Sequence, residues 1–319
     1  MTTVAEALTI AFDSHRAGDL DRAEAIYRQI LDVAPDHVDA LHLLGLVARR
    51  TGRHGMAAEL IRRAVALDPS FAEAQYNLGN ALMALGRHVE AVAPYRDALA
   101  VNPDHPGARR GLERALGRID PLDELAITLD GEYRDGRWSY LSALFEVARY
   151  GVVAGYVNRL AHGARLLDLG CGEGNLFPFL SPGAVTAYVG VDISEAALEK
   201  SKAQGEKVRL VCSPLETFTP AGDERFDVIL FNEVLVYIED PIAMIQRYRS
   251  WLADGGVMVV SYYKEPGEAG APAILKEKGF WTALDHGDWQ TLDEVSLHNH
   301  TRNLRWRIRL LRPQVVPVT

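Results

Sequence analysis

The sequence Leu-Leu-Asp-Leu-Gly-Cys-Gly-Glu-Gly-Asn at Leu166–Asn175 decides the fold of the second half of this 319-residue chain. An apolar run leads into an acid and then into three glycines at alternate positions, Gly170, Gly172 and Gly174. Glycine adopts positive φ without steric cost and lets the backbone approach a ligand closely. The order of residues therefore predicts a buried strand that ends in a tight turn, with a helix close behind.

Two later blocks repeat the pattern of an apolar run that ends in a polar residue. Val189–Ser194 reads Val-Gly-Val-Asp-Ile-Ser, and its Asp192 follows the glycine turn by about twenty residues. A carboxylate has two acceptor oxygens and can therefore hold both hydroxyls of a ribose. Phe226–Glu233 forms the third block. Together the blocks predict an adenosine-containing cofactor, whereas the glycine turn alone is also compatible with a tight turn that binds nothing.

The three blocks resemble class I S-adenosylmethionine-dependent methyltransferases, and the resemblance spans roughly residues 125–313. It implies an α/β, Rossmann-like domain with a mostly parallel seven-stranded sheet. The strands expected first are residues 165–168, 187–191, 207–212 and 226–231. The implied cofactor is S-adenosyl-L-methionine, with S-adenosyl-L-homocysteine as product.

The resemblance also implies which residues bind the cofactor. Asp168 is expected near its amino group, where a carboxylate offsets the positive charge of the ligand. Asp192 is expected at the ribose, and it is also a candidate cap for a helix that starts near Ser194. Pro214 replaces an acid that many relatives use at the adenine, so Leu215 and Glu216 are expected to contact it instead. The full predicted set is Asp168, Gly170, Cys171, Gly172, Gly174, Asp192, Ile193, Leu215, Glu216 and Asn232.

Methyl transfer is an in-line displacement, so positioning and pocket electrostatics supply most of the catalysis. A hydroxyl or ammonium acceptor also needs a base to take its proton. The candidates are Glu233 after the fourth strand and His286 in a loop expected at residues 282–289, with Tyr237 facing the acceptor. His286 is equally compatible with a surface loop histidine. The scheme needs no metal, and ligands at metal spacing are not evident.

The first third of the chain repeats with a period of 34 residues, which is typical of tetratricopeptide repeats. The equivalent positions are Pro35, Pro69 and Pro103; Gly18, Gly52 and Gly86; and Ala23, Ala57 and Ala91. Three repeats and a closing helix at residues 106–118 predict an all-α solenoid. A carboxylate clamp is not expected, because only Asn77 stands at the usual asparagine position. Partner binding and a structural role, by dimerisation or by bracing the enzyme, are both open.

We predict three segments. Residues 1–118 form the tetratricopeptide repeat domain, residues 119–163 a linker and lid helix, and residues 164–319 the methyltransferase domain. In the middle segment, residues 125–129 are expected as a short strand or turn and residues 140–160 as a helix. Tyr133, Trp138 and Tyr140 are candidates for the mouth of the pocket or for aromatic packing between the domains.

The composition limits where the protein acts and what it binds. A formal net charge of −9 argues against tight, sequence-independent binding to nucleic acid. No apolar run approaches the roughly 18 residues of a membrane span. The first residues lack the features of a signal peptide, and two cysteines provide no disulfide framework. We therefore expect a cytoplasmic protein with neither nucleic acid nor membrane as partner.

Three functions are compatible with the sequence. The favoured one is O- or N-methylation of a small-molecule or carbohydrate acceptor, with the repeats used for docking or assembly. Residues 232–240 support it because they resemble small-molecule and sugar methyltransferases, including the nodulation-factor N-methyltransferase. The second is a protein methyltransferase whose repeat groove recruits a peptide. The third is a non-catalytic scaffold that binds partners, which the intact Asp168, Asp192 and glycine turn oppose.

Overall fold

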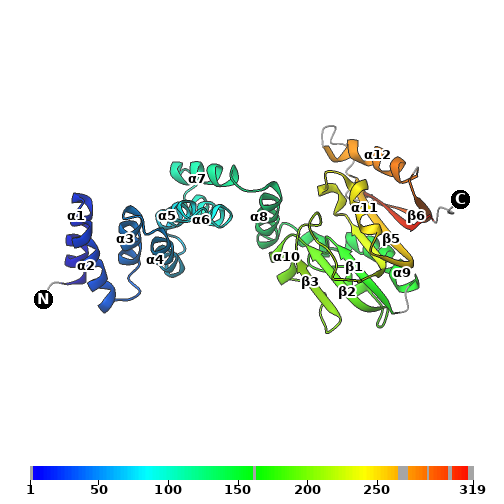
Figure 1. Cartoon of the computed structure of the whole chain (residues 1–319), viewed down its shortest axis with the longest axis horizontal. Coiled ribbons are helices and arrows are strands. Elements are labelled where there is room, and N and C mark those ends of the chain that lie inside the picture. Colours follow the sequence, from blue (N-terminus) through cyan, green and yellow to red (C-terminus); the bar gives the residue numbers. More distant parts are fainter. Residues whose placement is uncertain (1–2, 161–162, 265–271, 286, 301–303, 315–319) are drawn as a thin grey trace. The chain divides into compact units, whose positions relative to one another are not determined.

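The computed structural model describes residues 3–160, 163–264, 272–285, 287–300 and 304–314 (Figure 1). The chain divides into two compact units, Met1–Leu125 and Ala126–Thr319. The division falls inside helix α8 (Pro121–Arg134).

The first unit is a stack of helix pairs, as the 34-residue period predicts. Each pair is one repeat, and a further helix follows the third pair (Figure 1). The helices are α1 (Val4–Ala17), α2 (Leu20–Val33), α3 (Val38–Arg50), α4 (His54–Leu67), α5 (Ala72–Ala84), α6 (His88–Val101) and α7 (Pro106–Leu116).

Small residues at fixed places in the repeat let the helices pack closely. A Cβ atom added at Gly45 of α3 would lie 2.5 Å from Ile61 of α4, and one added at Gly79 of α5 would lie 2.6 Å from Tyr95 of α6. Gly18, at the end of α1, has a φ of 87°. Only glycine adopts that conformation without strain, so the glycines that recur between paired helices end the first helix of each repeat.

The second unit is a seven-stranded sheet in the order β3-β2-β1-β4-β5-β7-β6. The first five strands run parallel and β7 is antiparallel to both of its neighbours, so the predicted mostly parallel sheet is confirmed. The strands are β1 (Ala164–Leu169), β2 (Val185–Asp192), β3 (Val208–Cys212), β4 (Phe226–Asn232), β5 (Leu252–Lys264), β6 (Trp289–Asn299) and β7 (Leu304–Pro313).

Helices cover both faces of the sheet, and alternate residues of each strand point to opposite faces. Leu166 of β1 packs on one face with α9 (Leu144–Leu160). Leu167 packs on the other face with α11 (Pro241–Arg249) and α12 (Pro272–Asp285). The remaining helices are α10 (Glu195–Glu199) and the short 3-10 turns η1 (Ser139–Ser142), η2 (Phe177–Phe179) and η3 (Leu235–Tyr237).

Two local predictions were wrong. Residues 125–129 belong to helix α8 and form neither a strand nor a turn. Apolar Leu122, Leu125, Leu129 and Tyr133 recur at steps of three and four residues, which is the spacing of a helix face. The loop expected from residue 282 starts later, because α12 continues to Asp285.

Candidate active site

Strand register brings the predicted cofactor motifs to one edge of the sheet. Leu169 at the end of β1 pairs with Val191 of β2 on one side and with Phe231 of β4 on the other. Asp192 and Asn232 each follow those partners by one residue. The carboxyl ends of parallel strands at such a point form the usual ligand crevice of an open α/β sheet.

Close neighbouring atoms leave no room for a side chain at any of the three glycines of the turn. Gly170, Gly172 and Gly174 have φ values of 71°, 51° and 64°. A Cβ atom would lie 2.5 Å from Val234 at Gly170 and 2.7 Å from the Tyr133 hydroxyl at Gly172. The turn therefore packs against neighbouring protein atoms so closely that any side chain at these positions would clash. Cys171 within it is partly buried, and its Sγ lies 3.7 Å from the carbonyl oxygen of Gly172.

Asp168 is the most unusual carboxylate of the site. Its side chain is 2% exposed, and the Tyr188 hydroxyl donates a 2.7 Å hydrogen bond to Oδ2. Oδ1 is buried without a hydrogen-bond partner among the described residues. Burial raises the pKa of Asp168 to about 6. A buried acceptor of this kind fits the ammonium group of the methionine part of S-adenosylmethionine, which would supply both the missing hydrogen bond and a compensating charge.

Asp192 holds the turn in place. Its Oδ2 accepts from the backbone N–H of Gly172 at 2.8 Å, and its Oδ1 accepts from that of Ser194 at 2.9 Å. Each oxygen keeps a second lone pair for a ribose hydroxyl. The cap of α10 is Ser194, whose hydroxyl oxygen accepts from the N–H of Ala197 at 3.1 Å. Asp192 thus joins the two cofactor motifs through hydrogen bonds, and the helix is capped by its neighbour.

Arg149 of α9 lies at the site, although the sequence reading missed it. Its side chain is 2% exposed and forms an ion pair with Glu146 at 2.8 Å. Its Nη1 also donates to Oδ1 of Asn232 at 2.5 Å. A buried guanidinium this close to a predicted cofactor residue can bind a carboxylate, such as that of the methionine part. The sequence signal that could have revealed this site is the charged pair Glu146 and Arg149, which stand three residues apart on a mostly apolar helix.

Glu233, the first candidate base, directly follows strand β4. Its φ of 66° is the one positive value among the described residues other than glycine. The Ser261 hydroxyl donates to Oε1. Burial raises the pKa of Glu233, while the charge of Arg149 and the hydrogen bond from Ser261 partly offset that rise. Strained backbone of this kind is concentrated at functional sites.

The residues predicted near the adenine and ribose differ in their burial. The Leu215 side chain lies in the hydrophobic core, and its carbonyl accepts a 3.0 Å hydrogen bond from Tyr248. Only its backbone N–H therefore suits the predicted adenine contact. Glu216 is exposed. Ile193 is partly buried, and its carbonyl oxygen lies 3.6 Å from the thiol of Cys212.

A series of aromatic rings leads away from the glycine turn. Tyr133, whose hydroxyl lies beside Gly172, is followed by Trp138, Tyr140 and Phe145. Successive ring centroids in this series are 5.9, 6.0 and 6.2 Å apart. Tyr237, the predicted acceptor-facing residue, is 44% exposed. These rings provide flat apolar surface next to the predicted cofactor site.

The second candidate base, His286, lies outside the described residues. The preceding residue, Asp285, accepts a 2.7 Å hydrogen bond from Arg309 of β7. Trp281 and Trp289, on either side of His286 in sequence, are 4% and 3% exposed and belong to the hydrophobic core. Their burial makes them part of the packing under α12.

A family model described as a methyltransferase domain matches residues 144–316. The chain belongs to this methyltransferase family. A tetratricopeptide repeat model matches residues 16–70 and 56–108. The predicted repeats, the predicted enzyme class and S-adenosylmethionine as cofactor are therefore confirmed.

Curated relatives of this chain include several proteins named ubiquinone biosynthesis O-methyltransferase. The protein from Rhodopseudomonas palustris (strain BisB18) is 33% identical over 152 residues, covering 44% of this chain and 58% of that protein. The protein from Bradyrhizobium sp. (strain ORS 278) is 37% identical over 118 residues, covering 35% of this chain and 45% of that protein. The chain thus spans about half the length of these relatives.

Among solved structures, N-methyltransferase NodS from Bradyrhizobium japonicum WM9 in complex with S-adenosyl-L-homocysteine gives a TM-score of 0.47 at 20% identity. That alignment covers 59% of this chain and 97% of NodS. The repeat domain of Sgt2 from Aspergillus fumigatus gives a TM-score of 0.35 at 21% identity, covering 36% of this chain and 78% of that one.

None of the helices within the described ranges combines the length and apolar character needed to cross a membrane. Nor do the described histidine, cysteine and acidic residues form a group of three or more that could hold a metal ion.

Proposed function

We propose that this methyltransferase transfers a methyl group from S-adenosylmethionine to a hydroxyl oxygen of a ring-bearing small molecule. The observation that carries the proposal is Glu233, held in a strained conformation at the same sheet edge as the glycine turn. The name O-methyltransferase of the curated relatives favours oxygen as the methylated atom. The aromatic series from Tyr133 to Phe145 favours an acceptor with a flat ring, which either a phenol or a sugar provides.

In the proposed reaction, bound S-adenosylmethionine supplies a methyl group on a positively charged sulfur, which leaves as a neutral thioether. Asp168 and the glycine turn hold the methionine part, and Asp192 holds the ribose. The acceptor oxygen forms the new bond to the methyl carbon while Glu233 takes the hydroxyl proton. Because Ser261 occupies Oε1, Oε2 is the oxygen that receives it. A carboxyl pKa raised by burial suits this role, since a general base works best with a pKa near the operating pH.

The segment before the sheet acts as the lid in this proposal. Two contacts tie α8 to α10 within the same unit: Asp130 accepts from the Ser194 hydroxyl at 2.6 Å, and Lys200 donates to the Tyr133 carbonyl at 2.5 Å. These contacts support a lid that is anchored at Tyr133, next to the glycine turn. We also propose a cytoplasmic location, which the two free cysteines support.

The test is a screen of the full chain with S-adenosylmethionine that carries a labelled methyl group. Phenols, sugar nucleotides, glycans and lysate protein serve as separate acceptors. We expect label in a small molecule, and we expect Glu233→Gln to reduce turnover while cofactor affinity stays nearly unchanged. Glu206→Gln, at an exposed position, is the matched control.

Each other outcome of the screen has a defined meaning. Label found only in protein would replace the proposal with peptide methylation, for which the repeats provide a recruiting surface. No label in any acceptor, despite cofactor binding, would favour a partner-binding scaffold. Full turnover by the Glu233→Gln variant would remove Glu233 as the base.

A further inference from the structure

Helices α3 and α5, which are the first helices of the second and third repeats, and the closing helix α7 line a cavity of about 490 Å³ in the first unit. Three lining residues, Leu46 of α3, Asn80 of α5 and Arg114 of α7, are spaced by the 34-residue period and so occupy equivalent positions. Stacking of repeats places equivalent positions side by side on one surface. The other lining residues are Arg49, Glu73, Tyr76, Asn77 and Met83.

Two guanidinium groups in this cavity lack carboxylate partners. Nε of Arg49 is buried and makes no hydrogen bond within the described parts of the chain. Arg114 donates from Nε to the carbonyl of Arg110 at 3.3 Å, and no ion pair of either arginine occurs among the described residues. Both charges act on the hydroxyl of Tyr95, whose pKa burial nevertheless raises to about 12.

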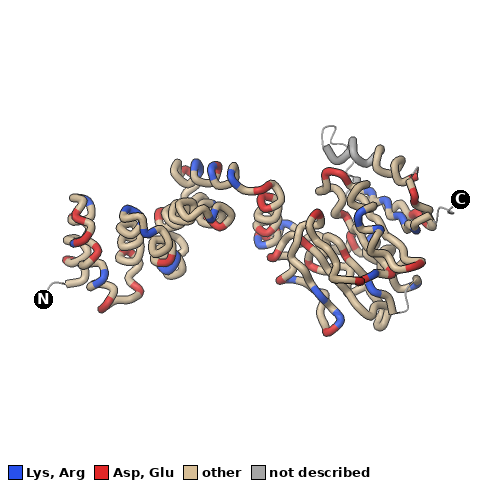
Figure 2. The backbone as a smooth tube through the Cα atoms, in the orientation of Figure 1, with Lys and Arg blue, Asp and Glu red and all other residues tan. Residues whose placement is uncertain are grey.

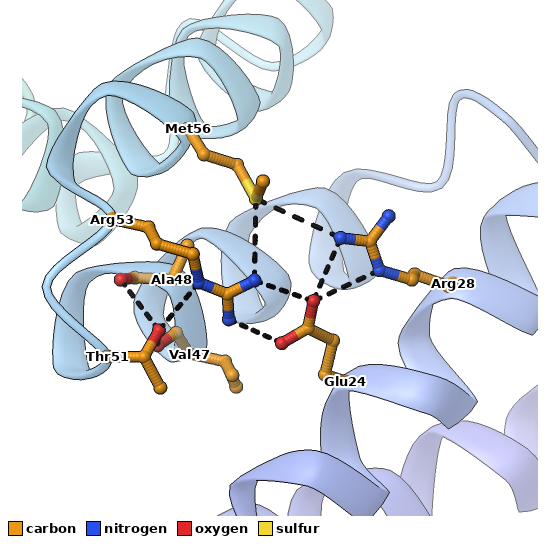
Figure 3. Close-up of polar contacts among 7 residues, drawn as sticks. All are labelled: Glu24, Arg28, Val47, Ala48, Thr51, Arg53 and Met56. Carbon is orange, nitrogen blue, oxygen red and sulfur yellow. Dashed lines mark hydrogen bonds and ion pairs between the residues drawn. The ribbon is translucent and has the colours of Figure 1, made fainter.

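A paired arginine site elsewhere in the repeats shows what a carboxylate partner does. Glu24 of α2 binds both Arg28 and Arg53, as Figure 3 shows. These two arginines lower the pKa of Glu24 to about 2, although burial acts in the opposite direction. The buried Nε of Arg49 has lost hydration and has no hydrogen bond in return, so it favours an anionic ligand.

The one acid that lines the cavity is engaged by the protein. Oε1 of Glu73 accepts from Nδ2 of Asn77 at 3.1 Å, and Oε2 contacts Nε2 of His105 at 3.2 Å. Two guanidinium charges against one carboxylate leave a positive cavity. Its apolar lining comes from Leu46, Tyr76 and Met83.

The helix that carries Arg114 extends this positive character. Helix α7 contains Arg109, Arg110 and Arg114 but a single acid, Glu113, and Figure 2 shows the blue segments along it. The whole chain, in contrast, has a net charge of −9. A basic surface on an acidic protein attracts acidic partners selectively, because complementary charge speeds encounter and disfavours other ligands.

We propose that this cavity binds side-chain carboxylates of an acidic segment in a partner protein. Arg49 and Arg114 bind the carboxylates, and the apolar lining contacts the residues between them. The site differs from a carboxylate clamp, since Thr9 and Leu43 stand at the positions equivalent to Asn77. It is independent of the methyl acceptor and gives the repeats a role in recruitment.

The test measures binding of a fluorescein-labelled peptide of alternating Glu and Leu to the full chain by fluorescence anisotropy. The peptide carries fluorescein at its N-terminus and is amidated at its C-terminus, so the glutamate side chains are the only carboxylates that the Gln-Leu counterpart lacks. We expect the Gln-Leu counterpart to bind at least about tenfold more weakly, because it lacks charge-assisted hydrogen bonds. Arg49→Gln and Arg114→Gln should each weaken binding of the acidic peptide by about tenfold. Arg118→Gln, outside the cavity lining, should leave its affinity unchanged.

Circular dichroism checks that each variant keeps its helices. If the partly buried Arg49 position does not tolerate glutamine, the exposed Arg114 decides the test. Equal binding of the acidic and glutamine peptides, unchanged affinity in Arg114→Gln, or no binding of the acidic peptide at about 1 mM would each overturn the proposal. Inorganic phosphate that binds in place of the peptide would also overturn it, in favour of a free anion as the ligand.

Discussion

Replacing Asp168 by asparagine should stabilise the free protein and weaken its binding of the cofactor. Burial raises the pKa of this carboxyl from 3.8 to about 6. One pKa unit corresponds to about 1.4 kcal/mol, so ionised Asp168 lowers the free energy of unfolding by about 3 kcal/mol relative to its neutral form. Asparagine resembles the neutral acid in shape and can still accept the hydrogen bond from Tyr188.

The sign of the pH dependence follows from proton binding. Between pH 4 and 6 the folded protein holds a proton on Asp168 that the unfolded chain has released, so stability falls as pH rises through this window. Above pH 6 both states are ionised and the cost is constant. The gain from Asp168→Asn should therefore reach its maximum, about 3 kcal/mol, above pH 6 and disappear near pH 4.

Urea unfolding followed by tryptophan fluorescence measures this gain in the relevant unit. All five tryptophans, the first being Trp138, lie in the second unit, so the signal reports only on the methyltransferase domain. Asp223→Asn, at an exposed position, controls for the loss of one negative charge. Calorimetry should show S-adenosylmethionine binding at least about tenfold more weakly to Asp168→Asn, through loss of a charge-assisted hydrogen bond.

Two results would refute this reasoning. A gain that is the same at pH 4.5 and pH 7.5 would mean that ionisation of Asp168 is not what costs stability. Unchanged cofactor affinity would mean that the buried Oδ1 does not face the ligand.

Three further substitutions test the remaining parts of the cofactor site. Asp192→Ala should weaken cofactor binding by about 1–3 kcal/mol in calorimetry, and unchanged affinity would remove Asp192 from the site. Gly172→Ala should abolish cofactor binding because its Cβ meets the Tyr133 hydroxyl at 2.7 Å, whereas Gly183→Ala, with φ of 81° and open space around it, measures backbone strain alone. Adding Tyr133→Phe should partly restore binding to the first variant; no recovery would show that strain and not the clash is responsible. Arg149→Ala should destabilise the methyltransferase domain by about 3–5 kcal/mol in the same urea assay, since it leaves a buried carboxylate unpaired, and a loss below about 1 kcal/mol would contradict the buried ion pair.

Local geometry explains what the sequence predicted well. The glycines of the turn and the acid that closes the next strand mark where strands end. The position of a strand end is set by residues that are adjacent in sequence, so it can be predicted from the sequence. The 34-residue period encodes helix pairs in the same way. The helix at residues 121–134 is also encoded locally, since Leu122, Leu125 and Leu129 show its apolar spacing, and the strand or turn predicted at residues 125–129 overlooks that signal.

The contacts that set the chemistry depend on distant residues, and only the tertiary structure decided them. Arg149 and Asn232 are 83 residues apart in sequence, and their contact follows from the packing of α9 beside β4. The raised pKa of Asp168 requires complete burial, which no local pattern reports. S-adenosylmethionine as cofactor could thus be predicted from the chain itself, because short motifs shape the turn that we propose holds its methionine part. The charge states around the site depend on burial, and the repeat cavity depends on packing of helices that are far apart in sequence, so neither can be read from a local pattern.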